Sequence, residues 1–471
     1  MNQQNRNPIN PMTSMLENLI ARIWNRIVLW RSEPPLSGGF DLGHHVVDGE
    51  VRDQHLYMPH IKRAEHIAIL GKTGTGKSSL LKYLTQHDIA ANRGFIHFDL
   101  HGDITPYVLR LIAQEERRRR QPLDSKLIII EPADQFYSVG LNPLQRTSGL
   151  ASFVQIAEVA QILKRRWHLE SFGPRTEELL RNSLFVLASN NLTLLELPHL
   201  LTDAGFRARC LERTENGDVR AYFQLRYDRA SEAMQGVMRD AVLNKITSFI
   251  SDLHFRHILG QRSSSFSLLQ AIDEGYWILL VLDKGRLGEE AATLGSLFLS
   301  QVKHALFSRQ RRHSLFTVYA DEIQNLLAFD SGLETLLSEA RKFGVGICSA
   351  NQFLDQYPQD MRSAILSIGS HILFQLSSVD ADKMAAALDG GKSLSELLKN
   401  LPQRHTVIKS GHYHWRHAVV PQLSAPEGDY SDLYERCRRR WARRRVEVEQ
   451  EIQARVTHRQ APPLEVPDEW E

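Results

Sequence analysis

The stretch His66–Leu81, HIAILGKTGTGKSSLL, decides the fold. Its apolar residues 67–70 predict a buried strand, its glycines predict a tight loop, and the residues from Lys77 onward are compatible with a helix. The spacing G-x-x-x-x-G-K-S is typical of a phosphate-binding loop, in which backbone N–H groups turn towards a phosphate chain at the positive end of a helix. An ordinary glycine turn is the alternative, but the strand and helix on either side favour a nucleoside triphosphate site.

Each residue of this loop has an expected role in binding the nucleotide. Lys77 is expected to pair with the β- and γ-phosphates, and Ser78 is expected to bind Mg²⁺. The predicted nucleotide-binding residues are Gly71, Lys72, Thr73, Gly74, Thr75, Gly76, Lys77, Ser78 and Ser79.

Length and composition limit the classes of protein that remain. A chain of 471 residues exceeds one ordinary core, which predicts either a large domain with an insertion or two domains. The 57 basic and 55 acidic residues leave a net charge of +2, so only local clusters can indicate nucleic acid. Cys210, Cys348 and Cys437 match no metal-ligand spacing and are typical of a reducing compartment. Since no run approaches the roughly 18 to 20 apolar residues of a spanning helix, we expect a soluble, cytoplasmic protein.

The pattern along the chain predicts an α/β fold with an inserted all-α domain. Apolar runs at 94–99 and 126–131 alternate with helical segments, which indicates a mainly parallel sheet. Segments with a period of 3.6 residues fill 151–252, and further strands are predicted at 276–282, 315–320, 345–350, 371–376 and 406–409. The predicted divisions are a disordered start and amphipathic helix at 1–34, a first part of the core with a small β element at 35–150, a helical insertion at 151–260, a second part of the core at 261–424 and a basic helical and disordered tail at 425–471.

An amphipathic segment precedes the predicted core. Residues 14–30 place leucines, isoleucines and Trp24 on one helical face, with arginines opposite. Such a helix either packs on its own domain, or contacts a partner or the surface of the inner membrane.

The best candidates for the carboxylates that hydrolysis requires lie in SLFTVYADEIQNL, residues 314–326. Asp321 is expected to bind the magnesium ion and Glu322 to orient the attacking water, because both follow a strand with a strong apolar pattern. Glu131 and Asp283 also follow predicted strands and are competing candidates. A strand that ends in solvated acids is the other interpretation.

Two further residues are candidates for the catalytic site. Gln352 follows the next strand, where its amide can both donate and accept hydrogen bonds at the γ-phosphate or the water, although turn glutamines are common there. Arg341 ends the helix GLETLLSEARKFG, where it either complements the helix dipole or reaches the nucleotide of a neighbouring subunit.

Basic clusters supply the sequence evidence for a nucleic-acid partner. They lie at 117–120, 164–166, 309–312 and 436–445, and the last contains seven arginines and a tryptophan. Arginines can contact phosphates and tryptophan can stack on bases, but a solvated helix face or a docking tail for an acidic protein has the same composition. The predicted contacts are Arg439, Arg440, Trp441, Arg443 and Arg444.

Taken in order, these motifs resemble the HerA/FtsK superfamily of DNA-pumping ATPases, and most closely the TraD/TraG type of conjugative coupling protein. The motifs are GKTGTGKS at 71–78, FDLHGD at 98–103, GLNPL at 140–144, YADEIQNL at 319–326, EARKFG at 339–344, ANQ at 350–352 and FQLSSVDADKM at 374–384. The resemblance covers roughly residues 60–420 and implies a RecA-like core, ATP and Mg²⁺ as cofactors, and a hexameric ring around DNA of unspecified strand form.

Carried over to this sequence, the resemblance implies that Asp321 and Glu322 form the acidic pair, Arg341 acts in trans and Gln352 is the sensor. It also implies partners in a secretion machinery, such as a relaxase. Coupling proteins generally begin with membrane-spanning helices, whereas this chain offers the segment 14–30. Two other functions therefore stay open, namely a HerA-like motor that acts with a nuclease in DNA end processing or defence, and an ATP-gated adaptor that docks protein substrates.

Overall fold

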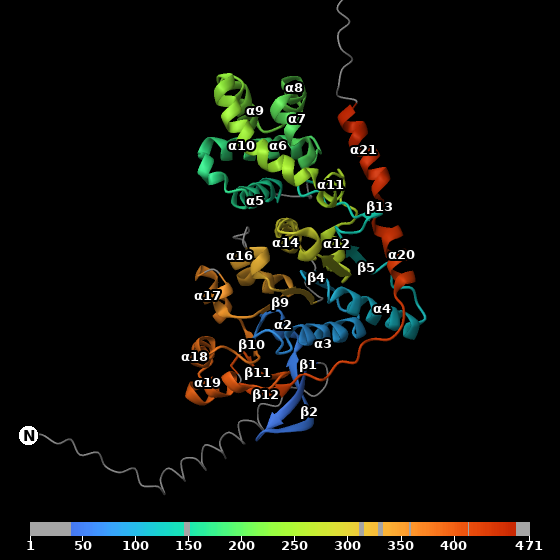
Figure 1. Cartoon of the computed structure of the whole chain (residues 1–471), viewed down its shortest axis with the longest axis vertical. Helices are drawn as coiled ribbons and strands as arrows, with labels where there is room; N and C mark the ends of the chain where they lie inside the picture. Colours follow the sequence, from blue (N-terminus) through green and yellow to red (C-terminus); the bar gives the residue numbers. More distant parts are fainter. Residues whose placement is uncertain are drawn as a thin grey trace, which may run out of the picture.

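The computed structural model describes residues 39–145, 151–309, 315–327, 333–357, 359–412 and 414–457. Figure 1 shows a core built around a large sheet, a helical domain above it, and two C-terminal helices that run along one side of both. The predicted α/β class with an all-α portion is confirmed. The amphipathic segment 14–30 lies outside the described residues.

The main sheet has eleven strands within the described part of the chain. Their order is β2 (Glu50–Pro59), β1 (Gly39–Val47), β12 (Arg416–Val419), β11 (His405–Ser410), β10 (Ser370–Leu373), β3 (Ile67–Leu70), β9 (Val345–Asn351), β8 (Phe316–Asp321), β4 (Phe95–Asp99), β7 (Trp277–Val281) and β5 (Leu127–Ile130). The seven strands from β10 to β5 are parallel, and the strands on the other side of β10 are antiparallel. The seven predicted strands after the glycine loop are all present in this sheet.

The parallel strands are apolar on both faces because helices cover both faces. In β7, Trp277 and Leu279 pack in one core with α3 (Lys77–Ala90) and α4 (Thr105–Arg119). The alternate residues Ile278 and Leu280 pack in the other core with α14 (Glu290–Phe307). The continuous apolar runs in the sequence follow from this burial.

The predicted small β element is a hairpin of the main sheet. Strands β1 and β2 are joined at Asp48 and Gly49, which both have positive φ (53° and 81°), as a type I′ hairpin turn requires. Strand β1 pairs with β12, with His44 opposite Val419. Strand β12 was not predicted from the sequence, and it is the strand that connects the hairpin to the sheet.

The remaining elements form the helical domain and the connections around the sheet. The helical domain contains α5 (Ala151–Arg166), α6 (Pro174–Ser189), α7 (Leu197–Thr202), α8 (Ala204–Glu212), α9 (Gly217–Ala221), α10 (Glu232–Ser251) and α11 (Leu253–Leu259). The core adds α2 (His60–Arg63), α12 (Leu268–Asp273), α13 (Lys284–Leu287), α15 (Gln324–Leu327), α16 (Leu333–Glu339), η4 (Ala340–Phe343), α17 (Gln359–Leu366), α18 (Ser378–Ala387) and α19 (Gly391–Asn400). Among the described residues, no helix combines the length and the apolar character needed to cross a bilayer.

The C-terminal strap, residues 431–457, connects the core with the helical domain (Figure 1). It comprises α20 (Ser431–Trp441), β13 (Arg443–Arg444) and α21 (Arg445–Thr457), and β13 pairs with β6 (Tyr137–Ser138). Arg436 in α20 lies 2.5 Å from Glu116 of α4 and 2.8 Å from Asp124. Glu449 in α21 lies 3.0 Å from Arg256 of α11. The predicted basic tail is therefore packed against the protein over residues 431–457.

A buried ion pair fixes the position of the segment that enters β3. Arg63 is 1% exposed and donates two hydrogen bonds to Asp88 of α3, at 2.7 and 2.6 Å. Its guanidinium also donates to Thr317 at 2.7 Å, and Tyr319 donates to Asp88 at 2.7 Å. Because these bonds join residues of three elements, the network ties α2, the C-terminal end of α3 and β8 together at the amino side of the sheet.

Replacing Arg63 by alanine should therefore be strongly destabilising. Removing one partner of a buried ion pair typically costs about 3–5 kcal/mol, because the other charge stays buried without compensation. We expect a clear fall in Tm by differential scanning calorimetry. Arg93, whose nearest guanidinium nitrogen lies 4.0 Å from Asp88 and whose side chain is 30% exposed, provides the matched control, and Arg93→Ala should have a much smaller effect. Equal losses of Tm would contradict this interpretation.

Candidate nucleotide-binding and catalytic site

The glycine loop lies between β3 and α3, as predicted. Gly74 and Gly76 have φ of 78° and 118°, a region that side chains disfavour. At Gly71 a Cβ atom would lie 2.5 Å from the Cβ of Phe374, so glycine is needed there for close approach. Thr75 closes the turn by donating to the carbonyl of Lys72 at 2.7 Å, and Ser79 lies in the first turn of α3. The loop geometry therefore follows from the residues that the sequence places in it.

Lys77 points into the loop. Its ammonium donates to the carbonyl oxygens of Gly71 and Lys72 at 2.6 and 3.0 Å, and the residue is 8% exposed. Burial lowers the pKa of Lys77, whereas the nearby charges of Asp321 and Glu322 oppose that shift. The loop therefore holds a positive charge where a phosphate chain would enter.

Ser78 and Asp321 meet at the carboxyl edge of the sheet. Strand β9 alone separates β8 from β3, so the residues that follow these strands lie at one edge. The Ser78 hydroxyl donates to Oδ2 of Asp321 at 3.0 Å. Asp321 is 6% exposed, and burial raises its pKa, with the Ser78 hydrogen bond and Lys77 opposing. The two predicted magnesium ligands are thus adjacent.

Glu322 and Gln352 form the second half of the site. The side-chain amide of Gln352 donates to Oε1 of Glu322 at 3.1 Å and accepts from the Thr73 hydroxyl at 3.0 Å. Glu322 adopts φ of 55°, and its backbone N–H donates to the carbonyl of Ala350 at 2.8 Å. Strain of this kind persists only where the surroundings hold it, and it is frequent at functional sites. Gln352 therefore links the phosphate loop to the predicted water-orienting carboxylate.

Arg341 lies at the opposite edge of the sheet. It belongs to η4, immediately before β9, whereas Gln352 follows the same strand. The seven residues of β9 separate the two positions by roughly 20 Å, since a strand rises about 3.3 Å per residue. Its side chain is 62% exposed and lies 3.0 Å from Glu65. Arg341 is thus too distant to contact a nucleotide bound by its own chain.

A family model described as "Type IV secretion-system coupling protein DNA-binding domain" matches residues 54–420. The chain belongs to this family. The match confirms the predicted resemblance to coupling proteins of the HerA/FtsK superfamily. No curated protein matches the sequence of the chain.

Solved structures share the fold of this coupling-protein family member. The plasmid coupling protein TrwB with a non-hydrolysable GTP analogue is 18% identical, with a TM-score of 0.57 over 85% of this chain and 99% of that chain. TrwB with a non-hydrolysable ATP analogue is 18% identical, with a TM-score of 0.56 over 84% and 98%. VirB4 of Thermoanaerobacter pseudethanolicus is 13% identical, with a TM-score of 0.52 over 83% and 99%. At sequence identities this low, the structural similarity shows that the fold is shared.

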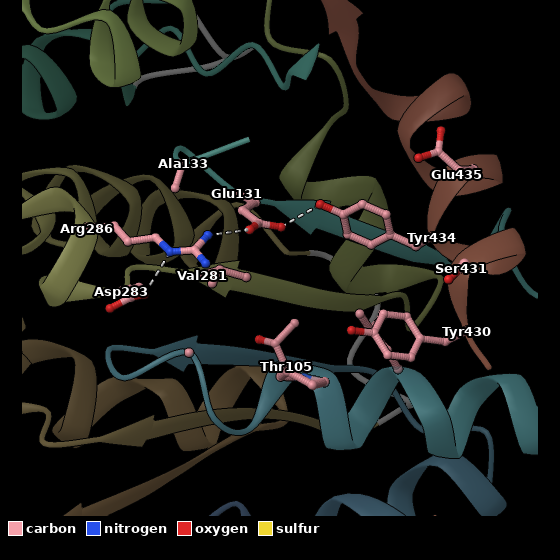
Figure 2. A pocket seen from close by; sticks show the side chains of 13 residues that line it. Thr105, Glu131, Ala133, Val281, Asp283, Arg286, Tyr430, Ser431, Tyr434 and Glu435 are labelled. Carbon is pink, nitrogen blue, oxygen red and sulfur yellow. Dashed lines mark hydrogen bonds and ion pairs between the residues drawn. The ribbon is translucent and has the colours of Figure 1, made fainter. Parts of the chain in front are cut away.

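The competing acidic candidates lie elsewhere on the carboxyl edge. Glu131 and Asp283 follow β5 and β7 and line a hollow of about 430 Å³ beneath α20 (Figure 2). Glu131 accepts from Tyr434 at 2.5 Å, and Arg286 lies between the two carboxylates, 3.5 Å from Asp283 and 4.0 Å from Glu131. In this family member Asp321 is therefore the carboxylate that meets Ser78, whereas Glu131 contacts the strap through Tyr434 and Asp283 accepts from the backbone N–H of Gly285 at 2.9 Å.

Most of the predicted DNA contacts in 436–445 are engaged within the chain. The Trp441 ring packs 5.9 Å from the ring of Tyr276, and its Nε1 donates to the carbonyl of Asp124 at 3.2 Å. Arg440 lies 2.8 Å from Asp124, and Arg443 lies 2.7 Å from Glu451. This packing argues against the prediction that Trp441 stacks on bases. Arg439, Arg440, Arg443 and Arg444 are all exposed, and their predicted contact with DNA stays a prediction.

Replacing Trp441 by alanine should destabilise the strap. Truncating a half-buried tryptophan is expected to cost about 2–3 kcal/mol, somewhat less than in a full core. We expect a lower Tm and faster proteolytic removal of residues 431–457, whereas the exposed Arg439→Ala variant should keep the wild-type Tm. If Trp441→Ala instead keeps its Tm and loses DNA affinity, the base-stacking role is restored.

Two residues of the site have no role predicted from the sequence. Asn325 donates to Oε2 of Glu322 at 3.0 Å, and Nε2 of His101 lies 3.6 Å from the same oxygen. His101 lies within the motif FDLHGD after β4, a position that was identified without a role. Asn325 lies three residues after Glu322, so predicting a turn at the end of β8 would have placed the two side chains together.

Proposed function

We propose that this coupling-protein family member is a Mg²⁺-dependent ATPase that moves DNA through a ring of identical subunits. The observation that carries the proposal is the convergence on one sheet edge of Lys77, the Ser78–Asp321 pair and the Thr73–Gln352–Glu322 series. Phosphate binding, metal binding and orientation of water each have a dedicated group there.

The residues present fit both predicted cofactors. The glycine loop and Lys77 suit a phosphate chain, and the Ser78 hydroxyl with the Asp321 carboxylate provides the hard oxygen ligands that Mg²⁺ prefers. Bound Mg²⁺ would neutralise charge on the phosphate oxygens. Structures of TrwB with ADP and Mg²⁺ and with an ATP analogue support this choice.

Glu322 is suited to act as the base towards water. Gln352 and Asn325 each donate to a different oxygen of its carboxylate, which fixes the plane of the group. A carboxylate has about four lone-pair positions, so capacity to accept from a water molecule remains. In this proposal Gln352 bridges the water-side carboxylate to Thr73 in the phosphate loop, as a sensor of the γ-phosphate would.

The position of Arg341 favours a ring. Because Arg341 lies at the edge opposite its own phosphate loop, a catalytic role requires a nucleotide held by another copy of the chain. The family resemblance implies six subunits around DNA, and the family description names DNA as the ligand. A relaxase or another component of a secretion machinery would then be the partner that delivers the DNA.

The test is steady-state ATP hydrolysis by the purified protein with and without single-stranded and duplex DNA, with Lys77→Ala as the blank. Stimulation by one form of DNA supports the motor and identifies its track. Hydrolysis that is indifferent to both forms contradicts DNA translocation and favours the adaptor that docks proteins. Wild-type turnover equal to that of Lys77→Ala contradicts the ATPase itself.

A further inference from the structure

The turn that follows β4 is unusually well fixed. Asp99 is 1% exposed, and its Oδ1 accepts from the backbone N–H of Gly102 at 2.9 Å. Its Oδ2 accepts from the backbone N–H and the hydroxyl of Thr105, at 2.8 and 2.6 Å. Gly102 has φ of 73°, which allows the chain to reverse here without strain. A single buried carboxylate thus determines the path of residues 99–105.

This fixed turn presents His101 to the catalytic carboxylate. Strand β4 pairs in parallel with β8, with Phe98 opposite Ala320, so the residues after the two strands are neighbours. His101 is 50% exposed, and its Nε2 lies 3.6 Å from Oε2 of Glu322. That separation is a few tenths of an ångström too long for a hydrogen bond, and catalytic hydrogen bonds often shorten to full contact when substrate binds.

The three residues near the Glu322 carboxylate come from different parts of the fold. Asn325 lies in the same turn, since its backbone N–H donates to the carbonyl of Glu322 at 3.0 Å, and it moves together with Glu322. Gln352 follows β9, on one side of β8, and His101 follows β4, on the other side. Gln352 and His101 therefore approach the carboxylate from the two neighbouring strands.

We propose that His101 is a positioning residue for hydrolysis, which holds Oε2 of Glu322 through its Nε2 so that Oε1 faces the attacking water. The inference rests on the proposed ATPase function. His101 acts through Glu322 and makes no contact with the nucleotide. Its removal leaves the carboxylate held by Gln352 and by Asn325 of its own turn, and takes away the restraint from the β4 side.

The test compares His101→Ala, His101→Gln and His101→Asn with the wild type. The amide nitrogen of glutamine reaches about as far as Nε2 of histidine, whereas the shorter asparagine reaches the position of Nδ1. Misplacing a catalytic group by about an ångström costs up to about 100-fold, so we expect kcat of His101→Ala to fall at least about 10-fold. KM and the Kd for a fluorescent ATP analogue should change less than about twofold, and His101→Gln should recover most of kcat where His101→Asn does not.

Asp103→Ala is the matched control for the turn itself. Asp103 lies two residues further along the turn, is half exposed and faces Lys82 of α3 at 3.6 Å. This variant should keep kcat, and all variants should keep the wild-type Tm.

Several results would overturn the inference and leave the ATPase proposal intact. The first is an unchanged kcat of His101→Ala, measured beside an inactive Lys77→Ala. The second is a loss of nucleotide affinity by His101→Ala without a loss of kcat. The third is an equal loss of kcat in Asp103→Ala. A wild type with no turnover above the Lys77→Ala blank would overturn the proposed function and this inference together.

Discussion

Replacing Glu322 by glutamine is expected to reduce ATP turnover by about 100- to 10,000-fold, the range that a positioned general base contributes. Glutamine keeps the size of the side chain but loses its charge and its basicity. It also has one acceptor oxygen, so it cannot accept from both Gln352 and Asn325, which donate to different carboxylate oxygens in this structure. Binding of ATP should persist, because the phosphate loop and the Ser78–Asp321 pair are untouched.

The measurement is steady-state hydrolysis beside equilibrium binding of a fluorescent ATP analogue. Glu396→Gln provides the matched control, because Glu396 is an exposed carboxylate of α19 that lies 3.1 Å from Lys399. This control should hydrolyse ATP like the wild type. Turnover retained by Glu322→Gln would place the base at another residue.

Replacing Arg341 by alanine is expected to leave ATP binding intact and to reduce hydrolysis by on the order of 1000-fold, the effect of a missing arginine finger. The reason is the location of Arg341 at the amino end of β9, opposite the carboxyl edge that holds the phosphate loop. The adjacent Lys342, which is equally exposed and pairs with Glu339 at 2.6 Å, provides the control, and Lys342→Ala should remain active.

Mixing subunits separates a contact in trans from an effect within one chain. An Arg341→Ala subunit keeps an intact site but lacks the finger, whereas a Glu322→Gln subunit has a dead site but keeps the finger. Rings that contain both should recover part of the lost activity at the interfaces where the two defects do not coincide. Mixtures that stay as inactive as the separate variants would contradict a contact between subunits.

The parts of the site that could be predicted are those whose position depends on a single segment of the sequence. The glycine loop has glycine at positions 74 and 76, where the backbone has positive φ, and Asp321 follows a strand whose apolar pattern is clear. Gln352 was predictable for the same reason, since it follows β9. His101 was not, because its role depends on β4 lying beside β8, and strand order is set by packing between distant segments.

The basic cluster near the C-terminus has contacts that the sequence could not indicate. Arg439, Arg440, Arg443 and Arg444 are exposed, as charged residues usually are. Arginines of the cluster pair with carboxylates distant in the chain, such as Asp124 for both Arg436 and Arg440. The tryptophan among them packs against Tyr276, a contact that the local pattern could not indicate.

The C-terminal strap has a mechanical consequence for the helical domain. The chain leads into that domain at Ala151 and leaves it after Leu259. The domain also packs on the core directly, since Glu158 of α5 lies 2.8 Å from Lys303 of α14. The strap adds a further attachment, through Trp441 on the core side and the Glu449–Arg256 pair on the domain side. A change in the angle between the domain and the core would therefore act on the contacts at one end of the strap as well as on those between α5 and α14.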